Sequence, residues 1–192
     1  MRLRRLVPVC LLAALAAVWV AEARGVDRRL ISNKADGIVY ALPKQSPFKV
    51  EKASVEGLTF KGRAVITGTY VFGRNSPAEE EMNGSKEPDL YFVPDAASAA
   101  LLPRWNEDGV IDGVYISNRD DFFNAVIAPE MVQKVKAGKV RSLTGPLTIE
   151  VEGYFATVIC GMPAYGTRFV RVATPPQVIA ANRHAETVSC KG

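Results

Sequence analysis

Two long segments rich in β-branched and aromatic residues, each with a glycine near its middle, constrain this chain most. The first is KGRAVITGTYVFG at residues 61–73, with Gly68 inside it. The second is VRSLTGPLTIEVEGYFATVICG at residues 140–161, with Gly153 inside it. Such composition is typical of β-strands, and a glycine within a strand indicates a bulge or a sharp bend. We therefore expect a mostly β protein in which two long strands bend strongly.

The second segment alternates with the period of a strand. Glu150 and Glu152 fall on one face, where charge is ordinary, so neither is given a catalytic role. The opposite, apolar face is predicted to hold Ile149, Val151, Phe155 and Ile159.

Shorter patterns complete the layout. A polar loop with two prolines occupies residues 74–88, and one or two short helices are expected between residues 120 and 138. Further strands are predicted at residues 38–42, 89–93, 110–117 and 167–173.

The order of these elements carries a resemblance to a known fold. A strand with a central glycine is followed by a long loop, two strands, a helix, a second strand with a central glycine, a turn and a last strand. This order resembles the OB-fold, a five-stranded Greek-key barrel, here with a short helix between its third and fourth strands. It is also similar to small exported OB-type domains of uncharacterised function with a TGT motif in the first strand. The resemblance covers about residues 61–173, and a β-sandwich is the alternative.

The first 23 residues have the three parts of a secretory signal peptide. Arg2, Arg4 and Arg5 are basic, residues 6–20 are apolar, and residues 21–23 form an A-x-A cleavage site. The apolar run of about 15 residues is short for a membrane span of roughly 20. An uncleaved anchor is the alternative. The pair Arg4-Arg5 also occurs in twin-arginine export signals, but the flanking residues do not otherwise support such a signal. We expect a periplasmic or secreted protein.

Removal of this leader changes the charge balance. The chain has 24 Lys and Arg and 20 Asp and Glu, and the leader holds three arginines and one glutamate. The mature chain would have 21 basic and 19 acidic residues, a net charge of +2 instead of +4. No long run of like charge remains, which argues against nucleic acid or an anionic membrane as a partner. We expect an envelope or extracellular protein or a small ligand as partner, and no membrane span after cleavage.

Two cysteines remain after Cys10 leaves with the leader. In an exported chain, Cys160 and Cys190 favour one disulfide. Its loop of about 30 residues would stabilise the fold by roughly 3 to 4 kcal/mol. The alternatives are a nucleophilic cysteine served by His184 and a metal site, but no CxxC or HExxH pattern is present. We predict a disulfide, with no catalytic residue, metal or cofactor.

Acidic clusters and one sequon complete the candidate sites. Residues 79–81, Asp108 with Asp112, and residues 120–121 lack the ligand spacing of a calcium loop and are interpreted as solvated turns. Asn83 fits a glycosylation acceptor only in a eukaryotic secretory pathway, and Asn-Gly equally indicates a turn. The predicted organisation is a signal peptide at 1–23, an N-terminal extension with a possible strand at 24–60, the barrel at 61–173 and a tail at 174–192 tied back by the disulfide.

The resemblance also implies where a ligand would bind. An OB barrel binds through its second and third strands and the loops beside them. This places the surface at residues 89–93 and 110–117, the loop 74–87 and the turn 160–166. The candidate side chains are Tyr91, Tyr115, Tyr165, Arg74, Arg119 and Arg168. Aromatic side chains that stack on bases, with arginines beside them, are typical of proteins that bind single-stranded nucleic acid. The expected export and the near-neutral net charge argue against this use.

The resulting hypothesis is an exported, non-enzymatic binding or interaction module of the cell envelope or secretome. The first alternative is a hydrolase that acts on an envelope polymer. The second is an inhibitor of a secreted hydrolase that inserts the loop 74–87 or the turn 160–166.

Overall fold

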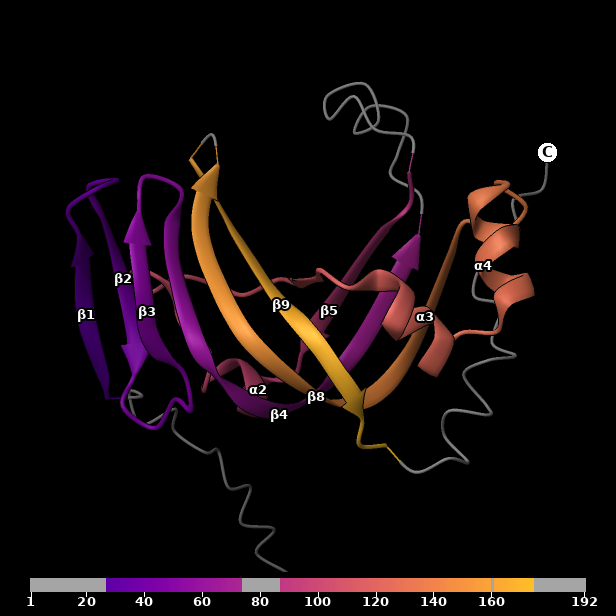
Figure 1. Ribbon diagram of the computed structural model, residues 1–192, viewed down its shortest axis with the longest axis horizontal. Coiled ribbons are helices and arrows are strands. Elements are labelled where there is room, and N and C mark those ends of the chain that lie inside the picture. The colour runs from indigo at the N-terminus through magenta and orange to yellow at the C-terminus, as the bar shows by residue number, and fades with distance from the viewer. Residues whose placement is uncertain (1–26, 74–86, 160, 175–192) are drawn as a thin grey trace, which may run out of the picture.

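Strands dominate the part of the chain that the computed structural model describes, residues 27–73, 87–159 and 161–174, so the mostly β expectation is confirmed. They form a three-stranded sheet in the order β1-β2-β6 and a six-stranded sheet in the order β3-β4-β5-β7-β9-β8 (Figure 1). In chain order the elements are β1 (Arg28–Asn33), β2 (Ile38–Pro43), β3 (Lys49–Ser54), β4 (Gly57–Gly73), β5 (Asp89–Pro94), α2 (Ala96–Ala99), β6 (Arg104–Trp105), β7 (Val114–Ile116), α3 (Arg119–Val126), α4 (Pro129–Lys136), β8 (Ser142–Ile159) and β9 (Met162–Val172).

Hydrogen bonds close five of these strands into a ring. The ring runs β4-β5-β7-β9-β8 and returns to β4. The closing pair, β4 with β8, extends from Leu58 opposite Ala156 to Gly73 opposite Ser142. β7 and β9 are parallel, and the other neighbours are antiparallel. The ring is a sheet curled on itself rather than two stacked sheets, and β3 continues it outside β4.

A bulge interrupts β8 at Gly153, as the sequence predicts. Gly153 has a φ of +61°, in the left-handed region that glycine adopts at little cost. The pairing of β8 with β9 changes register between Glu152 and Tyr154. An extra residue at a bulge shifts the alternation of the strand by one position.

This shift corrects the predicted inner face of β8. Ile149 and Val151, before the bulge, are buried as expected. Phe155 and Ile159 were predicted to share their face, but these side chains are 36 % and 58 % exposed. Tyr154 is buried in their place, because the bulge exchanges the two faces for the rest of the strand.

Of the bulge or sharp bend expected at Gly68, the bulge is absent, because the pairing of β4 with β8 runs through Gly68 without a change of register. Gly68 is instead needed for space, since a Cβ atom there would lie 2.1 Å from the carbonyl oxygen of Val93. The register of β4 shifts between Phe60 and Arg63, around Gly62 with its φ of +142°.

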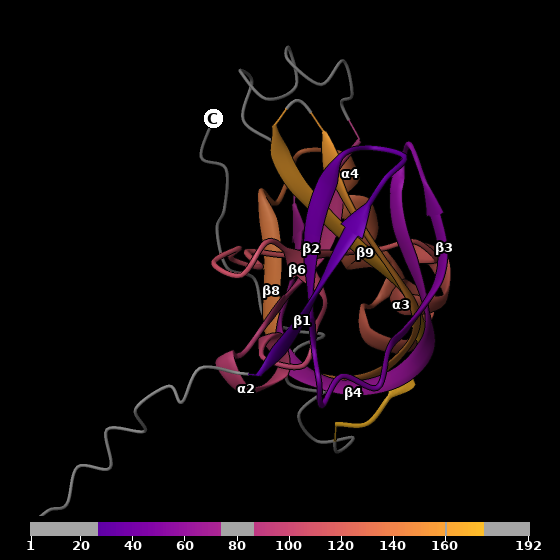
Figure 2. The same cartoon turned by 90° about the vertical axis from the view of Figure 1, so that its left-hand side faces the viewer.

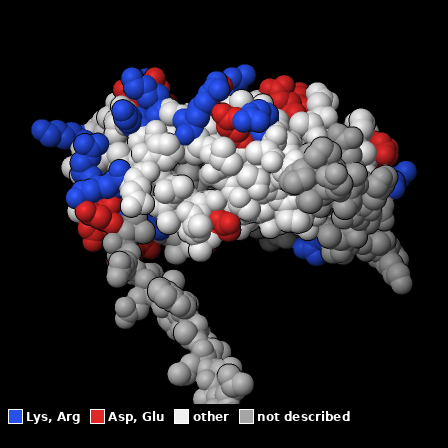
Figure 3. Space-filling model, turned by 90° about the horizontal axis from the view of Figure 1, so that it is seen from below, with Lys and Arg blue, Asp and Glu red and all other residues white. Residues whose placement is uncertain are grey.

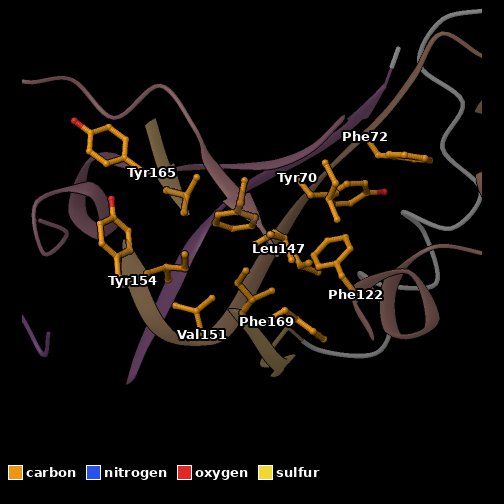
Figure 4. Close-up of a cluster of buried hydrophobic side chains, with 14 of the residues drawn as sticks. Tyr70, Phe72, Phe122, Leu147, Val151, Tyr154, Tyr165 and Phe169 are labelled. Carbon is orange, nitrogen blue, oxygen red and sulfur yellow. The ribbon is translucent and has the colours of Figure 1, made fainter. Parts of the chain in front are cut away.

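α3 lies at one end of the barrel (Figure 1), and its Phe122 points into the cluster of buried side chains (Figure 4). The ring centroid of Phe122 lies 5.7 Å from that of Tyr70 and 5.3 Å from that of Phe169. The adjacent Phe123 lies 4.7 Å from Phe72. These contacts connect α3 to β4 and β9 and bury Phe122 completely. α3 and α4 stand between β7 and β8 in the chain.

The small sheet lies at the other end, where β1 and β2 stand in front of the barrel in Figure 2. Its middle strand, β2, confirms the strand predicted at residues 38–42, and Tyr40 within it is fully buried. The backbone N–H of Trp105, in β6, donates to the hydroxyl of Tyr165, in β9, over 3.0 Å. Tyr165 in turn stacks on Tyr154 with centroids 6.2 Å apart. Within the described residues, no helix has the length and apolar character needed to cross a membrane.

Candidate binding face

Aromatic side chains line up across the outer face of the barrel. Tyr91 pairs with Tyr115 across β5 and β7, and Tyr115 pairs with Gly166 across β7 and β9. Gly166 in turn pairs with Phe155 of β8. The three aromatic residues therefore occupy one transverse line over four neighbouring strands, and we name Tyr91, Tyr115 and Phe155 the aromatic row. Tyr115 is 48 % exposed, so its ring is accessible to a partner.

Two glycines provide the space that the row needs. A Cβ atom at Gly166 would lie 1.9 Å from Cε1 of Phe155, so the Phe155 ring covers this glycine. A Cβ atom at Gly113 would lie 2.9 Å from Cδ2 of Tyr91. The rings of Tyr91 and Tyr115 meet edge to face, 6.5 Å apart at an interplanar angle of 61°.

A cavity of about 300 Å³ opens beside the two tyrosines of the row. We name it the tyrosine cavity. It is lined by Tyr91, Asp112, Gly113, Tyr115, Pro163, Ala164 and Tyr165. All three tyrosines predicted as ligand-binding residues thus meet at one place, although they come from three strands.

Tyr165 has a different position from the other two tyrosines. Its side chain is only 2 % exposed, and its hydroxyl is engaged by Trp105. Burial raises the pKa of Tyr165, which the hydrogen bond from Trp105 partly offsets. Tyr165 therefore forms the base of the tyrosine cavity and supports it, while Tyr91 and Tyr115 supply the accessible rings.

A partly buried guanidinium stands behind this base. Arg104 donates hydrogen bonds to the carbonyl oxygens of Ala99, over 2.5 Å, and Gly109, over 3.2 Å. Burial, followed by repulsion from Arg28, lowers the pKa of Arg104. Arg104 is not among the residues that line the tyrosine cavity. Arg104 therefore joins the end of α2 to the loop that follows β6.

A second groove lies on the other side of Phe155. It has a volume of about 690 Å³ and runs between the β3–β4 turn and the end of β8. Its surface is largely apolar, with Val55 and Ile159 exposed. The groove is lined by Lys52, Ser54, Val55, Glu56, Gly57, Leu58, Thr59, Phe155, Thr157, Val158 and Ile159. The aromatic row therefore has a cavity beside each of its ends.

The predicted arginines do not join the tyrosines. Arg119 donates to the carbonyl oxygen of Pro88 and lies over the ring of Phe123, 5.8 Å from its centroid. Arg168 pairs with Glu152 over 2.5 Å on a different part of the outer face. Arg74 lies outside the described residues.

Glu152 belongs to a charged cluster on this outer face. Hydrogen bonds from Arg168 and Arg63 lower the pKa of its carboxyl group. Arg63 lies 2.8 Å from Glu152 and 3.7 Å from Glu150, which also pairs with Arg171 over 2.5 Å. The charges are compensated across three strands, as is typical of cross-strand pairs on a solvated sheet.

Two residues of the site were missed from the sequence. A strict alternation of inward and outward side chains along β8 predicts Phe155 on the inner face. The bulge at Gly153 reverses this alternation for the residues that follow it. Asp112 was interpreted as part of a solvated turn, and it now lines the tyrosine cavity. The signal for Phe155 was present, since one extra residue at Gly153 exchanges the faces.

Other predicted features lie outside the described residues: Cys160, Cys190, His184 and Asn83. In the part of the chain that is described, no three His, Cys, Asp or Glu side chains gather in a way that could hold a metal ion.

No protein-family model, curated protein or solved structure matches this chain.

Proposed function

We propose that this protein is an exported, non-enzymatic binding module that takes its partner on the aromatic row. One observation carries the proposal: three aromatic residues occupy one line on the outside of four neighbouring strands, with a cavity at each end. Aromatic side chains bury a large area at low entropic cost and are enriched at binding hot spots. Exposed strand positions more usually carry charged or polar side chains than aromatic ones.

The arrangement of the ring supports an OB-type barrel. Its strands follow the order β4-β5-β7-β9-β8, β7 is parallel to β9, and α3 and α4 come between β7 and β8. In such a barrel the second and third strands and the turn between the fourth and fifth form the ligand face. Tyr91 and Tyr115 belong to the second and third strands of the ring, and Pro163 and Ala164 follow the turn.

The surface charge supports a partner other than nucleic acid. Seen from below, the molecule presents a broad, mostly uncharged face, with positive and negative side chains intermixed along its rim (Figure 3). Nucleic-acid binding depends on a basic surface that neutralises phosphates. The tyrosine cavity carries one charged residue, Asp112, which would repel a phosphate.

Export and the Cys160–Cys190 disulfide remain part of the proposal. They rest on the leader and on two cysteines in the mature chain. The mature protein should have a mass lower by two hydrogens than its reduced form and should start at Arg24. Two free thiols in the exported protein, measured by intact mass and alkylation, would exclude the disulfide.

The binding proposal is tested by capture with matched variants. The exported protein is immobilised and exposed to envelope and medium fractions, and retained molecules are quantified. We expect Tyr115→Ala and Phe155→Ala to reduce retention about tenfold or more, as at a hot spot. Val65→Ala is the control. Val65 is an exposed apolar residue of β4, six positions along the strand from Thr59, which pairs with Phe155 at the end of the row. Equal retention by all four proteins, with unchanged unfolding temperatures, would overturn the proposal.

A further inference from the structure

The tyrosine cavity combines accessible aromatic rings with a single charge. Asp112 is exposed and is the one charged residue among the seven that line it. Tyr91 and Tyr115 form two walls that meet at 61°. The remaining lining is glycine, proline, alanine and the buried Tyr165. The cavity is therefore aromatic and carries a net negative charge.

The negative charge of Asp112 has no oppositely charged partner within the part of the chain that the structure describes. Among the described residues, no ion pair or hydrogen bond is made by its carboxylate. The guanidinium behind the cavity, on Arg104, donates to the carbonyls of Ala99 and Gly109. Asp112 can thus pair with a charge that arrives from outside.

The rings favour the same sign of ligand charge. The face of a tyrosine ring is negative, and a cation within about 6 Å of its centroid is attracted. In the edge-to-face contact of Tyr91 and Tyr115, the edge of one ring meets a face of the other. A group in the cavity beside this contact can therefore meet a remaining ring face and the carboxylate of Asp112 together. An anion would meet repulsion from both. Aromatic rings and a carboxylate together are the chemistry that selects ammonium and guanidinium groups.

The size of the cavity suits an end group rather than a whole ligand. Pockets for drug-sized molecules occupy about 300 to 1,000 Å³, and the tyrosine cavity is at the lower limit. A guanidinium or an alkylammonium with its last methylene groups fits such a space. The rest of the partner would then continue along the aromatic row toward Phe155.

We propose that the tyrosine cavity is a specificity pocket for an organic cation, the guanidinium or ammonium end of a partner's arginine or lysine side chain. This rests on the proposed function, because the same row is taken as the partner surface. Asp112 supplies the charge, Tyr91 and Tyr115 supply the ring faces, and Tyr165 holds the base in place.

The test uses the full mature chain and defined probes. Amide and tyrosine ring signals are followed by nuclear magnetic resonance during titration with N-acetyl-arginine methylamide, N-acetyl-lysine methylamide and the uncharged N-acetyl-citrulline methylamide. We expect the two cationic probes to shift signals of Asp112, Gly113 and Tyr115, and citrulline to bind at least about fivefold more weakly. Asp112→Asn should remove the difference between arginine and citrulline. Equal binding of all three probes, or no shift at these residues with any probe, would overturn the inference.

Variants separate this inference from the proposed function. Asp112 is exposed, so Asp112→Asn should leave the remaining spectrum unchanged, and Asp112→Lys should abolish binding of both cations. If Tyr115→Ala and Phe155→Ala reduce partner retention while arginine and citrulline bind equally, the cation pocket is wrong and the binding module stands. If the cationic probes bind through Asp112 but retention is independent of the row, the pocket stands and the proposed partner surface is wrong.

Discussion

The hydroxyl of Tyr165 accepts a hydrogen bond from the backbone N–H of Trp105 over 3.0 Å, and this bond joins the barrel to the small sheet. Tyr165 belongs to β9 of the ring, and Trp105 belongs to β6, which pairs with β2. The contact explains why a tyrosine occurs at a buried position beside the tyrosine cavity. Its ring packs on Tyr154, and its hydroxyl satisfies a backbone donor of another sheet.

Tyr165→Phe should destabilise the protein by about 1 to 2 kcal/mol, because it leaves the Trp105 N–H without its acceptor. The free energy of unfolding in urea measures the loss, and hydrogen exchange should become faster at the Trp105 amide. Tyr91→Phe is the matched control, since the Tyr91 hydroxyl makes no hydrogen bond within the described residues. Equal stability of the two variants would show that the bond contributes nothing.

Gly153→Ala isolates the backbone strain of the bulge. The φ of +61° disfavours any residue with a Cβ atom, while the nearest atom to that Cβ would be the carbonyl oxygen of Phe60 at 3.9 Å, so no clash contributes. We expect a loss of about 1 to 2 kcal/mol. Gly153→Asn should lose less, because asparagine tolerates this region better. The midpoints of urea unfolding should therefore decrease in the order parent, Gly153→Asn, Gly153→Ala. An alanine variant as stable as the parent would contradict this expectation.

The two long strands could be predicted because their signals are local. Both carry β-branched and aromatic residues over many positions, and they are found as β4 and β8. The sequence also predicts the bulge at Gly153. The face on which Phe155 lies follows only if the one-residue shift at this bulge is applied to all later positions of β8. One residue of shift moves every later side chain to the other face, so an error of one position concealed the aromatic row.

The small sheet could be predicted only in its middle strand. β6 has two residues, Arg104 and Trp105, and so has no periodicity to read. β3, with the sequence KVEKAS, has more charge than a strand usually shows, because it is an edge strand that remains solvated. The fold resemblance predicts Tyr91, Tyr115 and Tyr165 as candidate residues, whereas their meeting at Asp112 depends on the parallel pairing of β7 with β9.

Glu152→Gln should alter how stability depends on pH. Arg168 and then Arg63 hold the pKa of Glu152 below its ordinary value of about 4.5. A carboxyl group with a lowered folded-state pKa stabilises the protein above its unfolded-state pKa, and this contribution is lost as the pH falls through the folded-state value. Below about pH 4.5, the variant should therefore lose stability less steeply than the parent.

Urea unfolding between neutral and acidic pH measures this difference. It should shrink in high salt, because the cluster is exposed to solvent. Glu51→Gln is the control, as Glu51 is exposed on β3 and makes no ion pair among the described residues. Parallel curves for the parent and Glu152→Gln would show that the pairs with Arg63 and Arg168 do not influence folding.

Alkaline pH should unfold the protein through its buried phenols. Burial raises the pKa of Tyr70 to about 12 and that of Tyr154 well above its ordinary value. Both groups remain protonated in the folded state when the unfolded chain begins to ionise near pH 10. Their contribution is fully present below pH 10 and is lost as the pH rises toward 12, on the order of 2 to 3 kcal/mol for Tyr70.

Part of the phenolate absorbance of the six tyrosines should therefore appear together with the loss of the far-ultraviolet circular dichroism signal. Tyr70→Phe should make the fall in stability above pH 10 shallower, whereas Tyr91→Phe should not. Complete ionisation of all six tyrosines before any loss of the dichroism signal would contradict the buried positions of Tyr70 and Tyr154.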